Sequence, residues 1–129
     1  MMKSQILFVD DEASLGEMLS LYFGHKGCEV TTATTIEGAM ARLGENSFQL
    51  VILDLNLAGQ DGLEVLRFVK KEHPHLPVVI FTGLDMDENL VKRCLADRAD
   101  GFMRKTDGLE KLFSEAQRHL KASSRGKPE

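Results

Sequence analysis

Short apolar runs recur along the chain and end abruptly on polar or charged residues. Three of them, residues 6–9, 50–53 and 78–81, contain no polar position. An unbroken run of this length is typical of a strand in a parallel sheet that is covered on both faces. The run at 28–33 is more polar and partly β-branched, which favours an edge strand. A short fifth strand is predicted at about 101–104.

Apolar stripes with helical spacing separate the strands and predict five helices. The stripes consist of Leu15, Met18, Leu19, Tyr22 and Phe23; Ile36, Ala39, Met40 and Leu43; Leu63, Leu66 and Val69; Leu90, Val91, Cys94 and Leu95; and Leu109, Leu112, Phe113, Ala116 and Leu120. The expected helix starts are Ser14-x-x-Glu17, Thr34-x-x-Glu37, the turn after Asp61-Gly62, Asp87, and Asp107-x-x-Glu110.

The alternation of strand and helix defines the predicted architecture. Five such alternations indicate an α/β fold, in which a parallel sheet carries helices on both faces. Because the first, third and fourth strands are the most apolar, we expect the strand order 2-1-3-4-5. The length of 129 residues suits one domain. We place this domain at residues 1–121, and we expect the small, polar segment 122–129 to be a flexible tail or the start of a linker.

Composition narrows the function classes. The chain has 16 basic and 20 acidic residues and a formal charge of −4, so it lacks the basic stripe expected of a protein that binds nucleic acid directly. Its apolar runs are too short to span a membrane or to form a signal peptide. Cys28 and Cys94 lack metal-type spacing and suit a reducing compartment. We therefore expect a cytoplasmic protein without a membrane partner.

The strand ends carry the candidate chemistry. Asp10 and Asp11 follow the first strand, Asp54 the third, Thr82 the fourth and Lys105 the fifth. The carboxyl ends of parallel strands share one edge of the sheet, where ligands of α/β proteins bind. Three carboxylates gathered there repel one another, and a hard divalent cation relieves the repulsion. Mg²⁺ is the expected cofactor, because it accepts one or two carboxylates together with waters and phosphate oxygens.

The same residues suit phosphoryl transfer. With the cation and Lys105 neutralising charge, the carboxylate of Asp54 can attack phosphorus and form an acyl phosphate. The oxygens of the transferred group would be met by Mg²⁺, by the Lys105 ammonium, and by the Thr82 hydroxyl with a backbone N–H.

The pattern Asp10-Asp11, Asp54, Thr82 and Lys105 closely resembles the receiver domain of bacterial two-component response regulators, over about residues 4–121. The resemblance implies a flavodoxin-like (βα)5 three-layer sandwich. It also implies that Asp54 accepts a phosphoryl group from a sensor histidine kinase or a histidine phosphotransfer protein. Beyond self-phosphorylation and autodephosphorylation, no enzyme activity is expected.

Further roles follow only from this resemblance. Asp11, Asp54 and the backbone carbonyl of Asn56 would hold Mg²⁺, with Asp10 reaching it mainly through water. Thr82 would swing toward the phosphoryl group and Phe102 would turn inward behind it. This switch would remodel the face formed by the fourth helix, fifth strand and fifth helix, where a downstream effector would bind. Asn56 and Leu84 would tune the lifetime of the phosphorylated state.

Two positions depart from the family pattern. Ala58 stands where the family often has proline in the loop after the acceptor. Thr106 follows Lys105 where proline is usual and the bond is commonly cis. Because a cis bond before a residue other than proline costs about 3 kcal/mol, we expect Lys105-Thr106 to be trans.

Two other classes of protein are alternatives. A haloacid-dehalogenase-type phosphatase also uses an Asp nucleophile, Mg²⁺ and Lys, but it needs an Asp-x-Asp after its first strand, and here the third strand carries Asp54-x-Asn56. A flavodoxin-like FMN carrier needs a phosphate-binding loop after the first strand. The acidic sequence Asp10-Asp11-Glu12 would repel a phosphate there.

Overall fold

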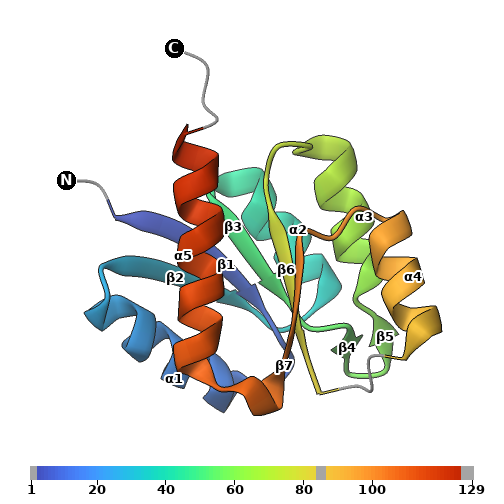
Figure 1. The fold of residues 1–129 in the computed structure, drawn as a ribbon, viewed down its shortest axis with the longest axis horizontal. Coiled ribbons are helices and arrows are strands. Elements are labelled where there is room, and N and C mark those ends of the chain that lie inside the picture. The colour runs from blue at the N-terminus through green and yellow to red at the C-terminus, as the bar shows by residue number, and fades with distance from the viewer. Residues whose placement is uncertain (1–2, 84–86, 126–129) are drawn as a thin grey trace.

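The computed structural model describes residues 3–83 and 87–125, and it contains the predicted parallel sheet (Figure 1). Within these residues the main sheet consists of β1 (Ser4–Val9), β2 (Cys28–Ala33), β3 (Leu50–Leu53), β6 (Val78–Thr82) and β7 (Gly101–Arg104). The order is β2-β1-β3-β6-β7, and every pair is parallel. Because β4 (Asn56–Leu57) and β5 (Gln60–Asp61) form a separate hairpin, the order of the main sheet is the predicted 2-1-3-4-5.

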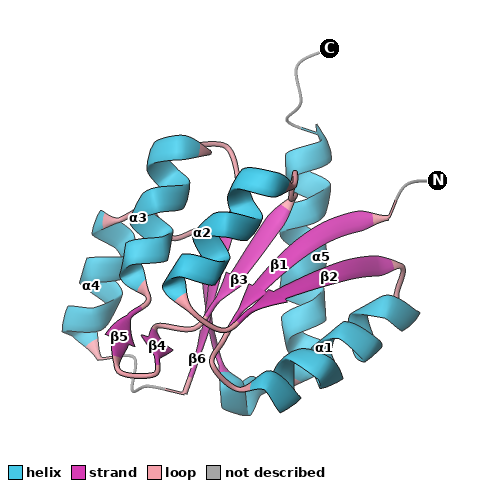
Figure 2. Cartoon of the chain, turned by 180° about the vertical axis from the view of Figure 1, so that it is seen from behind, coloured by secondary structure: helices cyan, strands magenta, loops and turns pink. Residues whose placement is uncertain are grey.

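Helices cover both faces of the sheet and complete a three-layer sandwich. Their bounds are α1 (Ala13–His25), α2 (Ile36–Glu45), α3 (Leu63–Glu72), α4 (Glu88–Ala96) and α5 (Leu109–Arg125), with a 3-10 turn, η1, at Lys105–Asp107. Figure 1 shows α5 in front of the sheet, and the reverse view in Figure 2 shows α2 and α3 in front of it. The α/β fold class is therefore confirmed.

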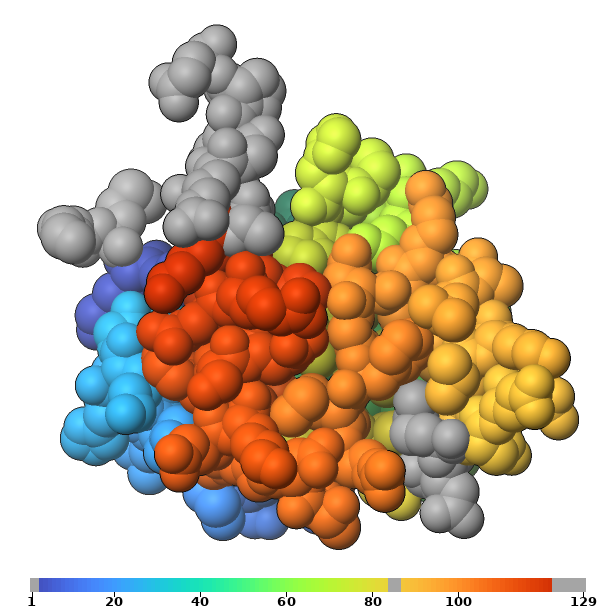
Figure 3. Space-filling model, in the orientation of Figure 1, coloured from blue at the N-terminus to red at the C-terminus, as the bar shows by residue number. Residues whose placement is uncertain are grey.

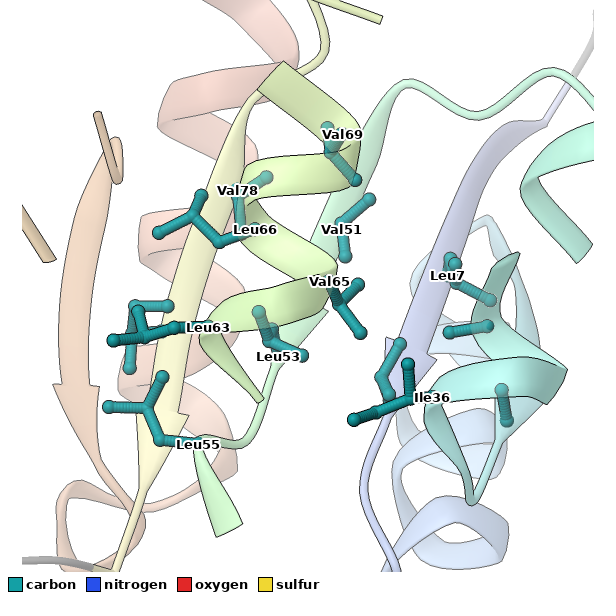
Figure 4. Packing of buried hydrophobic residues seen from close by; sticks show 14 of the residues in the cluster. Leu7, Ile36, Val51, Leu53, Leu55, Leu63, Val65, Leu66, Val69 and Val78 are labelled. Carbon is teal, nitrogen blue, oxygen red and sulfur yellow. The ribbon is translucent and has the colours of Figure 1, made fainter. Parts of the chain in front are cut away.

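The apolar strands alternate their side chains between two cores, which explains why they contain no polar position. In β1, Leu7 and Val9 belong to the core beneath α2, α3 and α4, whereas Ile6 and Phe8 belong to the core beneath α1 and α5. Figure 4 shows the first of these cores, where side chains of β1 and β3 face those of α2 and α3. Covering on both faces keeps β1, β3 and β6 in the middle of the sheet.

The helix starts differ in detail from the capping patterns. Ser14 lies inside α1, because the carboxylate of Asp10 accepts the Glu12 amide at 2.9 Å and turns the chain directly after β1. Thr35 caps α2, and its hydroxyl accepts the Gly38 amide at 2.9 Å. The same capping motif can be read with the helix start shifted by one residue. The path of the chain out of the preceding strand decides which residue begins the helix. The predicted starts at Ser14 and Thr34 were therefore wrong.

Of the predicted starts for the last two helices, one agrees with the structure and one does not. Asp87 caps α4 as expected, and its side chain accepts the Leu90 amide at 2.8 Å. Asp107 belongs to η1, and its carboxylate accepts the Arg104 amide at 2.9 Å and does not cap α5. The last helix continues to Arg125, so residues 122–125 are helical. The domain boundary at 121 stays a prediction, and residues 126–129 lie outside the described part of the chain.

Two large apolar residues of the predicted stripes are exposed to solvent. Met18 in α1 and Leu95 in α4 are each 56% exposed. Each helix contacts the sheet along a narrow line, and the predicted stripes were wider than that line. In α4 the buried residue is Cys94.

Candidate functional site

The parallel register brings the predicted site residues together at the carboxyl edge of the sheet. Val9 is paired with Leu53 and Leu53 with Ile80, so the residues after β1 and β3 and at the end of β6 meet there. Thr82 is paired with Arg104, which places Lys105 at the same edge. The predicted convergence is confirmed for Asp10, Asp11, Asp54, Thr82 and Lys105.

Asp54 lies at the centre of the cluster and is only 4% exposed. Its Oδ1 accepts the Thr82 hydroxyl at 2.8 Å and, over a longer distance of 3.3 Å, the Asn56 amide. Its Oδ2 lies 3.1 Å from Nζ of Lys105. The carboxylate is thus held by a hydroxyl on one side and an ammonium on the other.

Lys105 is shared among three carboxylates. Its Nζ lies 2.8 Å from Oδ2 of Asp10, 2.8 Å from Oε1 of Glu12 and 3.1 Å from Oδ2 of Asp54. Burial alone would lower the pKa of Lys105, but its close contacts with these three acids raise the pKa overall, so the amine is charged. Glu12 is a partner of Lys105 that the sequence pattern did not single out as a site residue, although it directly follows the two predicted aspartates.

Asp10 is the most deeply placed of the acids at 2% exposure. Burial raises its pKa, against the opposing effects of Lys105 and of the Glu12 amide, and the nearby charge of Asp54 raises it further. Oδ2 is buried and forms an ion pair with Lys105, yet within the described residues it accepts no well-aligned hydrogen bond. The cluster therefore holds more negative charge than Lys105 can satisfy.

The acidic cluster suits a hard cation. Asp10, Asp11 and Asp54 each offer an oxygen, and the three oxygens lie within 4.8 Å of one another. Asp11 is exposed, so the cluster opens to solvent on that side. The buried Asp10 oxygen without a hydrogen bond, the carboxylate donors and the solvent access all fit Mg²⁺ with retained waters.

A short hairpin after Asp54 closes one side of the site. The amide of Ala58, at the tip between β4 and β5, donates to Oδ2 of Asp11 at 2.9 Å. The amide of Gly59 donates to Oδ1 of Asn56 at 3.0 Å. The chain then passes so close to the residues that follow β3 that a Cβ on Gly62 would lie 2.3 Å from the carbonyl oxygen of Asp54. The sequence predicted a loop here, and the two-stranded pairing emerges only in the structure.

Phe102 lies on β7, behind the site. It is partly buried and packs against the core beneath α2, α3 and α4. With Val91 and Met103 it also lines a surface hollow of about 280 Å³. No peptide bond in residues 3–83 and 87–125 is cis, so Lys105-Thr106 is trans as expected. Leu84 lies outside the described residues.

A buried carboxylate thus lies at the end of a central strand of a five-stranded parallel sheet, beside further acids, a hydroxyl and a lysine. This fold and this set of side chains are typical of signalling domains of the receiver class. The sequence pattern of the family described as "Response regulator receiver domain" matches residues 6–117. The chain belongs to this family and is a receiver domain of two-component systems. The phosphatase and flavin-carrier alternatives are therefore set aside.

Individual relatives agree with the family. The chain is 33% identical to the probable transcriptional regulatory protein TcrX of Mycobacterium tuberculosis over 107 residues, which are 83% of this chain and 45% of that protein. It is 37% identical to the nitrogen assimilation regulatory protein NtrX of Azorhizobium caulinodans over 84 residues, 64% of this chain and 18% of NtrX. The chain thus spans less than half of these relatives.

Solved structures are similar over nearly the whole chain. NtrX from Brucella abortus, in complex with ADP, superposes with a TM-score of 0.86 and 34% identity over 95% of this chain and 28% of that one. A CheY-like receiver domain protein from Methanospirillum hungatei gives a TM-score of 0.91 over 97% of this chain and 99% of that one. Its identity of 22% supports the fold alone. In the described residues, no helix has the length and apolar character needed to cross a bilayer.

Proposed function

We propose that Asp54 accepts a phosphoryl group from a phosphohistidine of a sensor histidine kinase or a histidine phosphotransfer protein. The observation that carries this proposal is the position of the Asp54 carboxylate between the Thr82 hydroxyl at 2.8 Å and the Lys105 ammonium at 3.1 Å. Receiver domains of response regulators work with histidine kinases and effector domains, which supports the choice of donor.

The proposed reaction is a direct transfer. An oxygen of the Asp54 carboxylate attacks phosphorus, and the bond between phosphorus and the imidazole nitrogen breaks. The imidazole keeps the electron pair and takes up a proton from solvent. Lys105 leaves its ion pair with Asp54 and binds a phosphoryl oxygen, and the Thr82 hydroxyl donates to a second oxygen. Asp11, Asp54 and the Asn56 carbonyl would hold Mg²⁺, with Asp10 reaching it mainly through water, and the ion would neutralise charge on the transferred group.

The transfer would change the face formed by α4, β7 and α5. In Figure 3 these elements lie side by side on one surface of the molecule. When Thr82 follows the phosphoryl group, its hydrogen bond to Asp54 is lost, and Phe102 turns into the space behind it. The hollow beside Phe102 then changes shape, which would alter binding of a downstream effector protein or domain.

We also propose that the domain is cytoplasmic and that its chemistry is limited to self-phosphorylation and autodephosphorylation. Two free, buried cysteines suit a reducing compartment. Nucleic acid contact would belong to an effector, because the domain carries a net charge of −4.

The test is phosphorylation by acetyl phosphate with Mg²⁺, followed by intact mass. We expect one added phosphoryl group in the wild type and none in Asp54→Asn. Asp87→Asn is the matched control, because Asn still caps α4 and residue 87 lies outside the site. Full phosphorylation of Asp54→Asn would refute the proposed acceptor.

A further inference from the structure

We propose that the backbone N–H of Ala58 is an orienting group for the metal ligand Asp11, and that residue 58 thereby sets the Mg²⁺ affinity of the domain. This inference rests on the proposed Mg²⁺ site. It concerns a position at which the chain departs from its family.

The contact joins two distant parts of the sequence. Ala58 lies at the hairpin tip, and its amide donates to Oδ2 of Asp11 at 2.9 Å across 47 positions of the chain. In the described part of the chain this is the one hydrogen bond that the Asp11 side chain accepts. Asp11 is exposed, so this bond restricts a carboxylate that would otherwise rotate freely.

The backbone at the tip is what aims the amide. Ala58 has φ of 54° and Gly59 has φ of 85°, the paired positive values of a tight hairpin turn. The bond from the Gly59 amide to the Asn56 side chain holds the same turn. Proline cannot adopt a positive φ and has no N–H, so the residue that the family often carries here could not make this contact.

The contact leaves Asp11 able to bind a cation. A carboxylate has two oxygens, and the Ala58 amide engages only Oδ2. Within the described residues Oδ1 accepts no hydrogen bond, and Asp11 offers a carboxylate oxygen to the cluster formed with Asp10 and Asp54. Hydrogen bonds that hold metal ligands in place typically change metal affinity 10- to 100-fold when they are removed. Because Asp11 is exposed and water can partly replace the lost hydrogen bond, we expect a change near the lower end of that range.

The experiment is titration calorimetry of the full chain with MgCl₂. Ala58→Pro removes the N–H and the positive φ together, and we expect the Kd for Mg²⁺ to rise about tenfold. Ala58→Gly keeps the N–H and favours the positive φ, so its Kd should match that of the wild type. Replacing the residue by its hydroxy-acid analogue, lactic acid, changes only the amide to an ester, and it should raise the Kd as proline does.

A double-mutant cycle separates orientation from general damage. In an Asp11→Ala background the acceptor is absent, so the ester at position 58 should change the Kd no further. Ester and wild-type proteins with equal Kd values would overturn the inference, as would an ester effect that persists without Asp11. If Ala58→Pro fails to fold, the ester decides. Failure of the wild type to bind Mg²⁺ would refute the proposed metal site itself. That result differs from a wild type that binds Mg²⁺ as tightly as the ester variant does, which would refute only the role of Ala58.

Discussion

Lys105 illustrates how one side chain holds the site together before any ligand binds. It neutralises part of the charge of Asp10, Glu12 and Asp54, and its side chain is only 20% exposed. Three acids facing one ammonium leave a surplus of negative charge at the edge of the sheet. This surplus favours binding of a cation, and in the proposed reaction the cation would also offset the negative charge of the phosphoryl group.

Removing this ammonium should cost stability. We expect Lys105→Gln to lower the free energy of unfolding in Mg²⁺-free buffer by about 1–3 kcal/mol, because the mostly buried carboxylates lose their counter-charge. Urea denaturation with and without MgCl₂ measures the effect, and the ion should restore part of the loss.

Lys92→Gln is the matched control for this loss. Lys92 pairs with Glu88 across an exposed helix surface, so the change should cost under about 0.5 kcal/mol. Equal losses in the two variants would contradict the role assigned to the Lys105 ion pairs.

At the scale of elements, the exits from the strands decide where the helices begin. Asp10 accepts the amide two residues ahead of it, and α1 begins before the predicted cap Ser14. Thr35 accepts the amide three residues ahead of it, and α2 begins one residue later than a cap at Thr34 would give. Gly62 shows a similar constraint, because the chain after the hairpin passes too close to Asp54 for any side chain. Local chemistry thus offers several registers, and packing selects one.

The start of α2 provides a direct test of this selection. Thr35→Ala removes the hydroxyl that accepts the Gly38 amide, and we expect it to lower the free energy of unfolding by about 1 kcal/mol. Thr34→Ala changes the neighbouring exposed threonine, which the capping motif had favoured, and it should cost less than about 0.5 kcal/mol. Thermal or urea unfolding of both variants gives the comparison, and a reversed ranking would show that Thr34 is the true cap.

At the scale of the whole molecule, the two cores depend on one sheet. Cys28 belongs to the core beneath α1 and α5, and Cys94 belongs to the core on the opposite face. The buried Lys70 of α3 binds Asp100, just before β7, at 2.7 Å and the Leu76 carbonyl at 3.0 Å, which ties the far end of the sheet to its helices. Because β1, β3 and β6 line both cores, we expect the two cores to open together.

The two cysteines can report this cooperativity. Both are buried and burial raises the pKa of each thiol, so a thiol reagent should react at least about 10³-fold more slowly with the native protein than with the unfolded chain. Measured separately in Cys28→Ser and Cys94→Ser, the two remaining thiols should show similar protection. Rapid labelling of one thiol alone would indicate that its face of the sheet opens independently.

The sequence allowed the fold to be predicted because a central parallel strand has a distinctive composition. Residues 6–9, 50–53 and 78–81 needed to be apolar on both faces, and this requirement places them in the middle of the sheet whatever their exact neighbours. The positions of Asp10, Asp54, Thr82 and Lys105 then followed, since the ends of parallel strands share an edge. Their chemical roles in phosphoryl transfer stay predictions.

Other features depended on distances between segments far apart in the chain. Neither the contact of Glu12 with Lys105 nor that of Ala58 with Asp11 has a local signature, because each joins residues that only the closed sheet brings together. The exposure of Met18 and Leu95 depended likewise on the narrow line along which a helix meets the sheet. Periodicity and strand ends are local properties of the chain, and they determined the fold class and the residues of the site. The hydrogen-bond and ion-pair partners of those residues were decided only by tertiary packing. Such a contact forms only when two side chains lie within a few ångströms of each other, and the packed fold alone sets that distance.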